Sequence, residues 1–129
     1  MTNKYMYFIA NWKMYGVLKT LNSLNRVISF TKKNKKTKMK LIYCPPSTLI
    51  SMLSKKLKNS SIEVGAQNCH ESQKYASLTG QINSNMLKDA GAKFIILGHS
   101  ENRLSGEENI LINKKIKSAL KVGLKIILC

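Results

Sequence analysis

The segment FIILGHSE, residues 94–101, joins four consecutive apolar residues directly to a polar sequence. An apolar run of this length, rich in isoleucine, is typical of a strand and too short for a helix. Because the apolar side chains are consecutive rather than alternating, both faces of the strand should be covered, as in parallel sheets. We therefore predict a buried parallel strand at Phe94–Gly98, with polar residues where it ends.

Four other short segments share this composition, and we predict strands there as well. They are Tyr5–Ala10 (YMYFIA), Lys40–Cys44 (KLIYC), Ile62–Ala66 (IEVGA) and Lys125–Cys129 (KIILC). The strand starts are about 22–35 residues apart, which is the length of one strand–helix unit. This spacing leaves room for a helix between each pair of successive strands.

Helical patterns occupy the first two intervals, where apolar residues recur every three or four positions and form stripes. The first stripe consists of Val17, Leu21, Leu24 and Ile28, and the second of Leu49, Leu53 and Leu57. Pro45-Pro46-Ser47 precedes the second stripe and is typical of an entry turn. Each stripe predicts one helix packed on the sheet.

The other two intervals also contain helical patterns. A short helix is expected at Ser84–Ala90, with Gly91 as its C-cap. The last helix is expected to start at Ser105–Glu108, which has the pattern of a capping box, and to end at Gly123. Its inward-facing residues would be Ile112, Ile116 and Leu120.

This alternation predicts an α/β fold, in which helices cover the faces of a parallel sheet. Two architectures remain open, a doubly wound sheet and a (β/α)8 barrel. No G-x-G-x-x-G sequence follows the first strand, which weakens a dinucleotide-binding interpretation. A complete barrel needs ~250 residues, so this chain could supply only about half of one.

The composition is that of an ordinary globular domain. Apolar residues make up 43% and charged residues 22%, and the 7 Gly and 2 Pro exclude collagen-like and low-complexity classes. The N-terminal sequence MTNKYMYFIANWKM lacks the pattern of a signal peptide, so we expect a cytoplasmic protein. Neither the cysteines (Cys44, Cys69 and Cys129) nor the two histidines form a zinc-binding pattern, so we expect reduced thiols and no metal.

The net charge of +16 raises the alternative of a Lys-rich module that binds polyanions or nucleic acid. Specific readers of nucleic acid rely on arginine forks and aromatic stacking, but lysine supplies 20 of the 22 basic residues here. The densest run, Lys32–Lys40, lies between two apolar segments and is most simply a solvated helix end and loop. We therefore expect neither a nucleic-acid nor a membrane partner.

Two predicted strand ends carry residues that suit chemistry, because function gathers at this edge in strand–helix proteins. Asn11-Trp12-Lys13-Met14 follows the first strand, so Lys13 could meet an anionic ligand or be a surface lysine. Gly98-His99-Ser100-Glu101 follows the fourth strand. Free N–H groups at the start of a helical turn favour a neutral His99, which could donate a hydrogen bond to a carbonyl oxygen. A structural histidine is the alternative.

Together the two motifs resemble the triosephosphate isomerase family, which carries N-W-K-M/L after its first strand and G-H-S-E-R-R after its fourth. Further matches keep the family's order: Cys44-Pro45-Pro46, Gly65-Ala66-Gln67-Asn68, Thr79-Gly80, Met86–Ala92 and Gly106-Glu107. The resemblance implies the N-terminal part of a (β/α)8 TIM barrel, with residues 1–129 as one incomplete domain. It also implies an aldose–ketose isomerase of glycolysis and gluconeogenesis that interconverts dihydroxyacetone phosphate and glyceraldehyde 3-phosphate without a cofactor.

The resemblance assigns roles to individual residues. Lys13 would be the cation that meets the substrate's phosphate, and Asn11 would orient the substrate. His99 would polarise the carbonyl, in the pairing of a carboxylate base with a neutral histidine that is already established for this family. Glu101 and Ser100 would hold His99 and Lys13 in place.

Two departures from the family matter for activity. The family's general base is a glutamate in a Tyr-Glu-Pro-x-Trp motif, and neither this motif nor the Gly-rich phosphate-binding turns occur in the chain. The chain stops at Cys129 inside a predicted strand, so we expect an N-terminal fragment that is inactive alone. A stable half-barrel with only a structural role is disfavoured, because its outer strands would be unpaired edges.

The family's dimer loop also differs here. The loop reads Thr79-Gly80-Gln81 instead of Thr-Gly-Glu, and Asn102 replaces the arginine that follows His-Ser-Glu. In the family that glutamate and arginine pair across a homodimer, which we expect for the full-length protein. A neutral amide pair would then replace an ion pair, or the two changes are independent.

Overall fold

The structure is a computed structural model that describes residues 4–34 and 38–129. Its strands are β1 (Met6–Asn11), β2 (Met39–Cys44), β3 (Glu63–Ala66), β4 (Phe94–Leu97) and β5 (Lys125–Leu128). Its α-helices are α1 (Asn25–Lys33), α2 (Ile50–Leu57), α3 (Ser84–Asp89), α4 (Ser100–Leu104) and α5 (Asn109–Lys121). The 3₁₀ segments η1 (Leu18–Leu24) and η2 (Ser47–Leu49) precede α1 and α2. None of the helices in the described ranges is long and apolar enough to cross a membrane.

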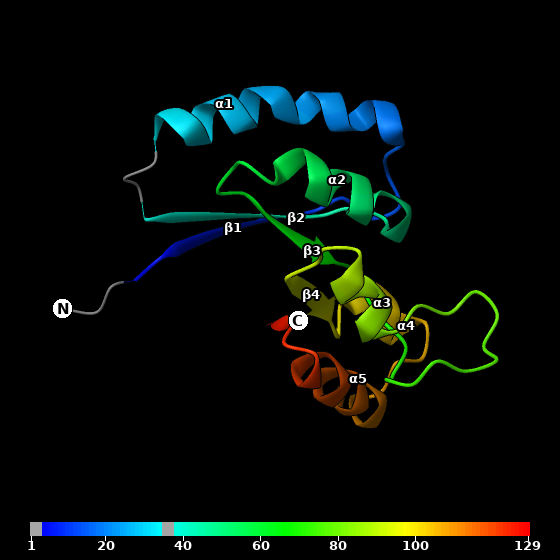
Figure 1. Cartoon of the computed structure of the whole chain (residues 1–129). Helices are drawn as coiled ribbons and strands as arrows, with labels where there is room; N and C mark the ends of the chain where they lie inside the picture. Colours follow the sequence, from blue (N-terminus) through cyan, green and yellow to red (C-terminus); the bar gives the residue numbers. More distant parts are fainter. Residues whose placement is uncertain (1–3, 35–37) are drawn as a thin grey trace.

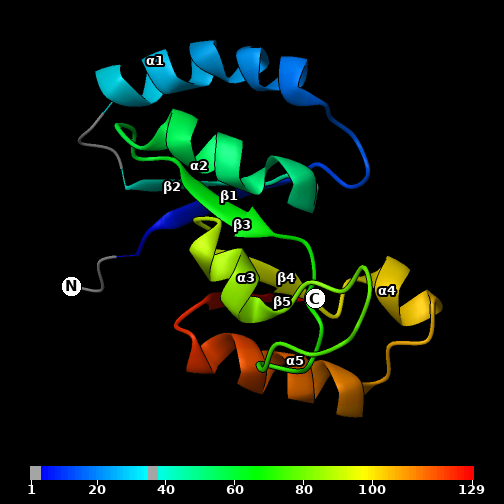
Figure 2. The ribbon, with the colours of Figure 1, turned by 45° about the vertical axis from the view of Figure 1, so that its right-hand side comes forward.

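The strands form one parallel sheet in the order β1-β2-β3-β4-β5. A doubly wound sheet reverses its strand order, whereas a barrel adds each strand beside the previous one. Right-handed crossovers then place every helix on the same side of the sheet. Figures 1 and 2 show α1, α2, α3 and α5 along the outside of the curved sheet. Of the two architectures left open, the chain therefore forms part of a (β/α)8 barrel.

The two faces of the sheet have separate apolar clusters. In β4, Ile95 and Leu97 pack with helix residues in the larger cluster. The alternate residues Phe94 and Ile96 join the smaller cluster, which among the described buried residues contains strand positions only. The helices thus cover the outer face, and the smaller cluster is the start of the barrel interior.

The five predicted strands are confirmed, and each predicted boundary lies within one residue of the observed one. β1 is nevertheless exposed along most of its length, including the large side chains of Tyr7 and Phe8. It pairs with β2 on one side only among the described strands. The first strand is therefore an open edge, as expected of part of a barrel.

Two of the predicted helix faces are wrong at one end, whereas the second stripe (Leu49, Leu53 and Leu57) is buried throughout. Val17 is 65% exposed and Leu120 is 55% exposed, although both were predicted to face the core. The segment after Val17 is a 3₁₀ helix, so residues three apart share a face, and Leu21 and Leu24 are the buried pair. In α5 the inward face is rotated, because Lys115 and Ser118 are buried in it.

The predicted capping box at Ser105–Glu108 is also wrong. Ser105 is the C-cap of α4, and its hydroxyl donates to the carbonyl of Glu101 at 3.0 Å. α5 begins later, at Asn109, after an N-cap Glu108 whose side chain makes no capping bond. Ser105 therefore ends one helix instead of starting the next.

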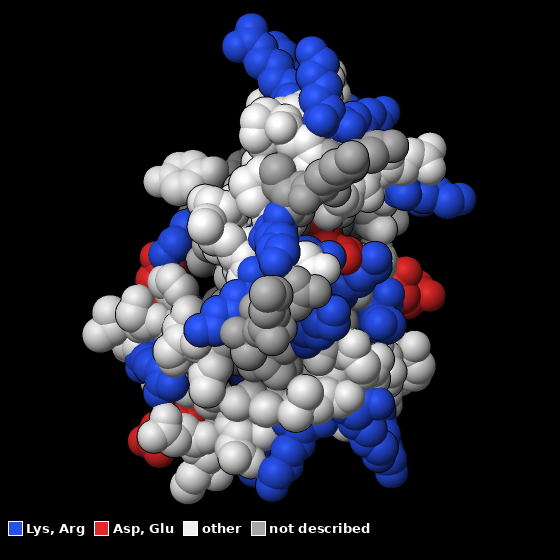
Figure 3. Space-filling model, turned by 90° about the vertical axis from the view of Figure 1, so that its left-hand side faces the viewer, with Lys and Arg blue, Asp and Glu red and all other residues white. Residues whose placement is uncertain are grey.

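The lysines gather at the amino ends of the strands. Each α-helix other than α4 carries lysine in its last turn, and the members are Lys32, Lys33, Lys55, Lys56, Lys88 and Lys121. Helices antiparallel to the strands end at this face, where cations complement the negative ends of the helix dipoles. Figure 3 shows the face, on which blue side chains outnumber red ones. Six of the 20 lysines thus lie at helix ends, and residues 35–37 of the lysine run lie outside the described residues.

Two of the three thiols are buried and inert. Burial raises the pKa of the Cys44 thiol to about 12 and that of Cys69 to about 11. Because the thiolate is the reactive form of cysteine, neither side chain is a nucleophile near neutral pH. Cys44 instead fills space on the inner face of the sheet, next to Gly65 of β3.

This contact generates a prediction about packing in the barrel interior. A Cβ at Gly65 would lie 2.5 Å from Sγ of Cys44, so Gly65→Ala should destabilise the fold by ~1–3 kcal/mol through overpacking. Cys44→Ala removes the sulfur, and the double variant should therefore lose less stability than the sum of the two single variants. Urea denaturation of all four proteins measures the coupling. Strictly additive losses would show that a side chain at position 65 does not clash with the sulfur of Cys44.

Candidate functional site

A pocket of about 560 Å³ opens at the carboxyl ends of β1 to β4. Its lining residues are Asn11, Lys13, Met14, Tyr15, Ser47, Gln67, Asn68, His99, Glu101 and Asn102. They come from four loops, each of which follows a strand of the parallel sheet or lies close behind it. The pocket therefore lies where strand–helix proteins place their functional residues.

Lys13 has a strained backbone conformation that is held from both sides. Its φ is 56°, and it is the one non-glycine residue with positive φ among those described. Its N–H donates to Oδ1 of Asn11 at 2.9 Å. Its carbonyl accepts from Nε2 of Gln67 at 2.8 Å.

Gln67 is a part of the site that sequence reasoning used only as a family match. The same Nε2 that reaches Lys13 also donates to the carbonyl of Cys44 at 2.8 Å. One amide group therefore joins the exits of β1, β2 and β3. No local pattern could have revealed this role, because its two acceptors are 23 and 54 residues away along the chain.

The side chain of Lys13 spans the pocket and meets the histidine motif. Its Nζ lies 3.2 Å from Nε2 of His99 and 2.9 Å from Oε1 of Glu101. The sheet thus brings together the two motifs that the sequence singled out, which are 86 residues apart. Asn11 lies beside them as a lining residue and supports the backbone of Lys13.

The ring of His99 faces donors on both sides. The backbone N–H of Glu101 donates to Nδ1 at 3.3 Å, and the Lys13 ammonium approaches Nε2. The contact with the Glu101 N–H fits a neutral ring that accepts at Nδ1 and carries its proton on Nε2, because a neutral imidazole has one lone pair and one N–H. The carboxylate Oε2 of Glu101 also lies 3.4 Å from Nδ1, but the amide contact is shorter and fixed by the backbone.

The hydrogen bond from Lys13 lowers the pKa of the Glu101 carboxyl below its usual value. Partial desolvation opposes this change, while the positive charge of Lys13 reinforces it. Glu101 therefore stays ionised across the neutral range and holds the ammonium next to His99. Glu101 thus contacts both Lys13 and His99, whereas the exposed Ser100 side chain forms no hydrogen bond with the described residues.

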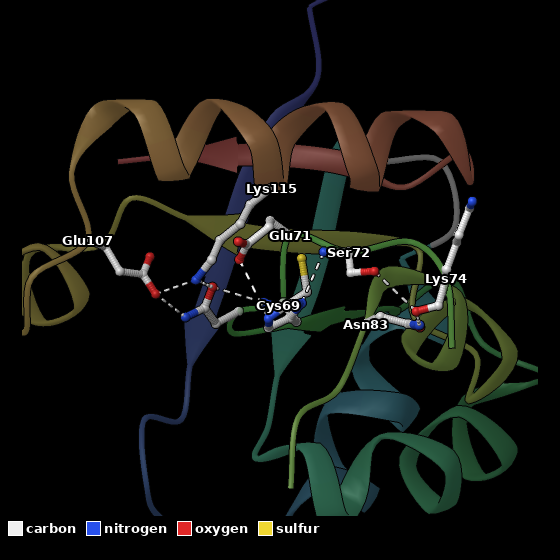
Figure 4. Close-up of polar contacts among 9 residues, drawn as sticks. Cys69, Glu71, Ser72, Lys74, Asn83, Glu107 and Lys115 are labelled. Atoms are coloured by element: carbon white, nitrogen blue, oxygen red, sulfur yellow. Dashed lines mark hydrogen bonds and ion pairs between the residues drawn. The ribbon is translucent and has the colours of Figure 1, made fainter. Parts of the chain in front are cut away.

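A second polar cluster supports the pocket wall from behind. Lys115 reaches from α5 toward Glu107, and Figure 4 shows the two side chains pointing toward one another. Asn68 joins them, since its Nδ2 donates to Oε1 of Glu107 at 2.7 Å and its Oδ1 accepts from Lys115 at 3.2 Å. Oε2 of Glu107 is buried without a partner in the described residues. The cluster ties the exit of β3 to α5.

The dimer-loop residues Thr79, Gly80 and Gln81 lie outside the pocket. They are exposed in a long arm between β3 and α3, which projects from the molecule in Figure 1. The arm is tied at its base, where Asn85 donates to the carbonyl of Gln73 at 2.7 Å. Asn102, the other changed position, lines the pocket.

The chemistry available in the pocket is electrostatic and proton-transferring. Lys13 is a cation suited to an anionic substrate, and a neutral His99 can donate to an oxygen on which negative charge develops. Within the described residues, no group of three or more His, Cys, Asp or Glu side chains is placed to hold a metal ion. Glu101 is the one carboxylate among the lining residues, and Lys13 already engages it.

Comparison with known proteins identifies what this arrangement is similar to. The model of the triosephosphate isomerase family matches residues 6–129. The chain is 41% identical to triosephosphate isomerase of Alkaliphilus oremlandii and 38% identical to that of Aquifex aeolicus, in each case over 93% of this chain and 48% of the relative. A crystal structure of triosephosphate isomerase from Bartonella henselae superimposes with a TM-score of 0.86 at 33% identity, over 95% of this chain and 50% of that one. The chain thus spans about half the length of the relatives it matches.

The contact between Lys13 and Glu101 predicts a pH dependence. Because the pKa of Glu101 is lowered in the folded state, the contact stabilises the fold above the carboxyl's unfolded pKa. That contribution disappears as the pH falls through the lowered folded value. Lys13→Met should raise the Glu101 pKa toward its usual value, as measured by NMR titration of the carboxyl carbon. Lys19→Met, a change at an exposed lysine in η1, should leave the titration unchanged; an equal rise in both variants would contradict the assignment.

Proposed function

Because the chain belongs to the triosephosphate isomerase family, we propose that its protein interconverts dihydroxyacetone phosphate and glyceraldehyde 3-phosphate in glycolysis and gluconeogenesis. The observation that carries the proposal is the contact of Lys13 with His99 and Glu101 at the open edge of the sheet. An isolated cationic site would not need a histidine beside the ammonium of Lys13. The reaction moves hydrogen within one molecule, so no cofactor is proposed.

The roles follow from the position of each group. Lys13 attracts the phosphate-bearing substrate and stabilises negative charge on the reacting oxygen. His99 donates a hydrogen bond to the carbonyl as it becomes an enediolate and moves the proton between the two oxygens. Asn11 lines the pocket and orients the substrate, while Glu101 keeps Lys13 aimed at His99. Ser100 is also proposed to help hold His99 and Lys13 in place, and this role rests on the resemblance to the family alone.

The general base must come from another segment. Proton abstraction from carbon needs a free base within hydrogen-bond reach of the substrate. The carboxylate of Glu101 is unsuited to this step, because Lys13 engages it and lowers its pKa, which makes it a weak base. We place the base in the family's Tyr-Glu-Pro-x-Trp motif, which residues 1–129 do not contain. The 129-residue chain alone is therefore proposed to be inactive.

We also propose that two copies of the complete protein associate through the arm that carries Thr79–Gln81. The arm is exposed and tied at its base, which suits insertion into a second copy. Asn102 at the edge of the pocket would meet Gln81 of the second copy as a neutral amide pair. A cytoplasmic location without nucleic-acid or membrane partners fits the three free thiols and the helix-end positions of the lysines.

Activity provides the first test of the proposed function. The complete polypeptide that contains this chain should isomerise glyceraldehyde 3-phosphate in a coupled assay. Lys13→Met should lower kcat/KM by ~100- to 1,000-fold, the range for loss of one strong electrostatic contact. Lys19→Met is the matched control and should be silent. Full activity without the Lys13 charge, or turnover by the 129-residue chain alone, would contradict the assigned roles.

Salt dependence tests the proposed association. Analytical ultracentrifugation of the complete polypeptide should show a dimer whose dissociation constant changes little with salt, because an amide pair carries no charge to screen. The double variant Gln81→Glu, Asn102→Arg introduces an ion pair and should give a dimer that weakens as salt rises. A monomer at every concentration would contradict the proposed interface, and identical salt dependence would contradict the pairing.

A further inference from the structure

Arg103 in α4 links three elements that lie far apart in the sequence. Its Nε donates to the carbonyl of Gly98 at 2.6 Å, its Nη1 to Oδ1 of Asn109 at 2.8 Å, and its Nη2 to the carbonyl of Cys129 at 3.0 Å. Gly98 follows β4, Asn109 begins α5 and Cys129 follows β5. One side chain therefore joins the exits of two strands to the first residue of a helix.

Arg103 also holds both peptide groups that flank His99. The carbonyl of Gly98 accepts from Nε, and the carbonyl of His99 accepts from the backbone N–H of Arg103 at 3.0 Å. These two peptide planes set the backbone angles of His99, φ −59° and ψ 144°. The Arg103 side chain therefore holds the peptide group before His99, while the backbone N–H groups of Asn102 and Arg103 hold the carbonyl of His99 itself.

Gly98 leaves space for the guanidinium. It has φ +72°, and a Cβ at this position would lie 2.8 Å from Nη2 of Arg103 and 3.0 Å from the carbonyl oxygen of Cys129. Glycine adopts this left-handed conformation without strain and adds no side chain to the turn. The guanidinium can therefore lie directly against the turn that precedes His99.

A guanidinium is suited to these contacts in a way that an ammonium is not. Its N–H groups diverge within one rigid plane, whereas lysine offers all its donors from a single nitrogen. The acceptors that Arg103 finds at Gly98 and Asn109 are neutral amide oxygens. Lysine makes up 20 of the 22 basic residues of the chain, but at position 103 the contacts require the diverging N–H groups of arginine.

We propose that Arg103 is a positioning residue for His99. Its guanidinium anchors the turn that carries His99 to β5 and α5, and this holds the imidazole in line with Lys13. The proposal rests on the proposed isomerase function and extends it, because Arg103 does not line the pocket and acts only through His99.

The first test compares two identical substitutions in the complete polypeptide that contains this chain. Arg103→Lys keeps the charge and most of the aliphatic stem but removes the fork. We expect kcat to fall about 10-fold or more with KM almost unchanged, because a displaced catalytic group affects the transition state most. Arg26→Lys is the matched control at an exposed arginine of α1 that forms no hydrogen bond or ion pair with the described residues. It should change neither constant.

Chemical rescue separates positioning from general stability. In Arg103→Ala, added guanidinium ions should restore part of kcat, whereas methylammonium should not, since it lacks the planar fork. A residue that only stabilises the fold would give a lower thermal midpoint without rescue. Asn109→Ala covers the case in which the Arg103 variants fail to fold, because it removes one acceptor and leaves the arginine in place. Its kcat should fall about 3-fold, with shifted ¹⁵N resonances of the His99 ring.

Two results would overturn the proposal. One is a folded Arg103→Lys variant whose kcat equals that of the unsubstituted protein. The other is an Asn109→Ala variant in which both kcat and the His99 resonances are unchanged. Failure of the proposed function would differ from both, because the unsubstituted polypeptide would then not isomerise triose phosphates. In that event the ¹⁵N resonances of His99 in the Arg103 variants would still report whether the guanidinium sets the ring's position.

Discussion

The common direction of the five strands is the constraint on which the rest of this structure depends. Because every helix returns the chain to the same end of the sheet, all strand exits meet along one edge. Lys13 and His99 are 86 residues apart, yet each lies just beyond a strand, and the sheet places their nitrogen atoms 3.2 Å apart. The lysines that end the helices lie at the opposite edge for the same reason. The common strand direction therefore places Lys13, which pairs with Glu101, at one edge of the sheet and the lysines of the helix ends at the other.

The positions of the Lys13 and His99 side chains in the pocket are set by hydrogen bonds that side chains of other elements make to the backbone. A left-handed conformation costs a residue such as Lys13 roughly 1–2 kcal/mol. Two hydrogen bonds offset this cost, since each contributes about 1 kcal/mol. The N–H of Lys13 donates to Asn11, and the carbonyl of Lys13 accepts from Gln67. His99 is held in a comparable way, by donors to the carbonyl before it and to its own carbonyl. The two side chains thus meet because their backbones are fixed from outside the pocket.

The arm between β3 and α3 shows how the same fold accommodates change. Its base is fixed by Asn68, Glu107 and Lys115, which connect the exit of β3 to α5, while its end is exposed. Glutamine and asparagine stand at Gln81 and Asn102, where the family carries an ion pair. Gln81 lies outside the pocket and Asn102 lines it, and neither side chain is part of the contact between Lys13 and His99.

The sequence by itself determined the strands, the class of fold and the two motifs of the site, because consecutive apolar residues and local motifs depend on neighbours in the chain. It misjudged Val17, Leu120 and the start of α5, since a 3₁₀ segment and a buried Lys115 rotate the faces that a regular helix would present. Strand order alone separated a barrel from a doubly wound sheet. The contacts of Gln67 and the bond from Arg103 to Cys129 carry no local signal, because their partners lie 23, 54 and 26 residues away and come together only when the strand exits meet. Only the tertiary structure could decide these contacts, because hydrogen bonds between distant segments depend on where the folded sheet places them.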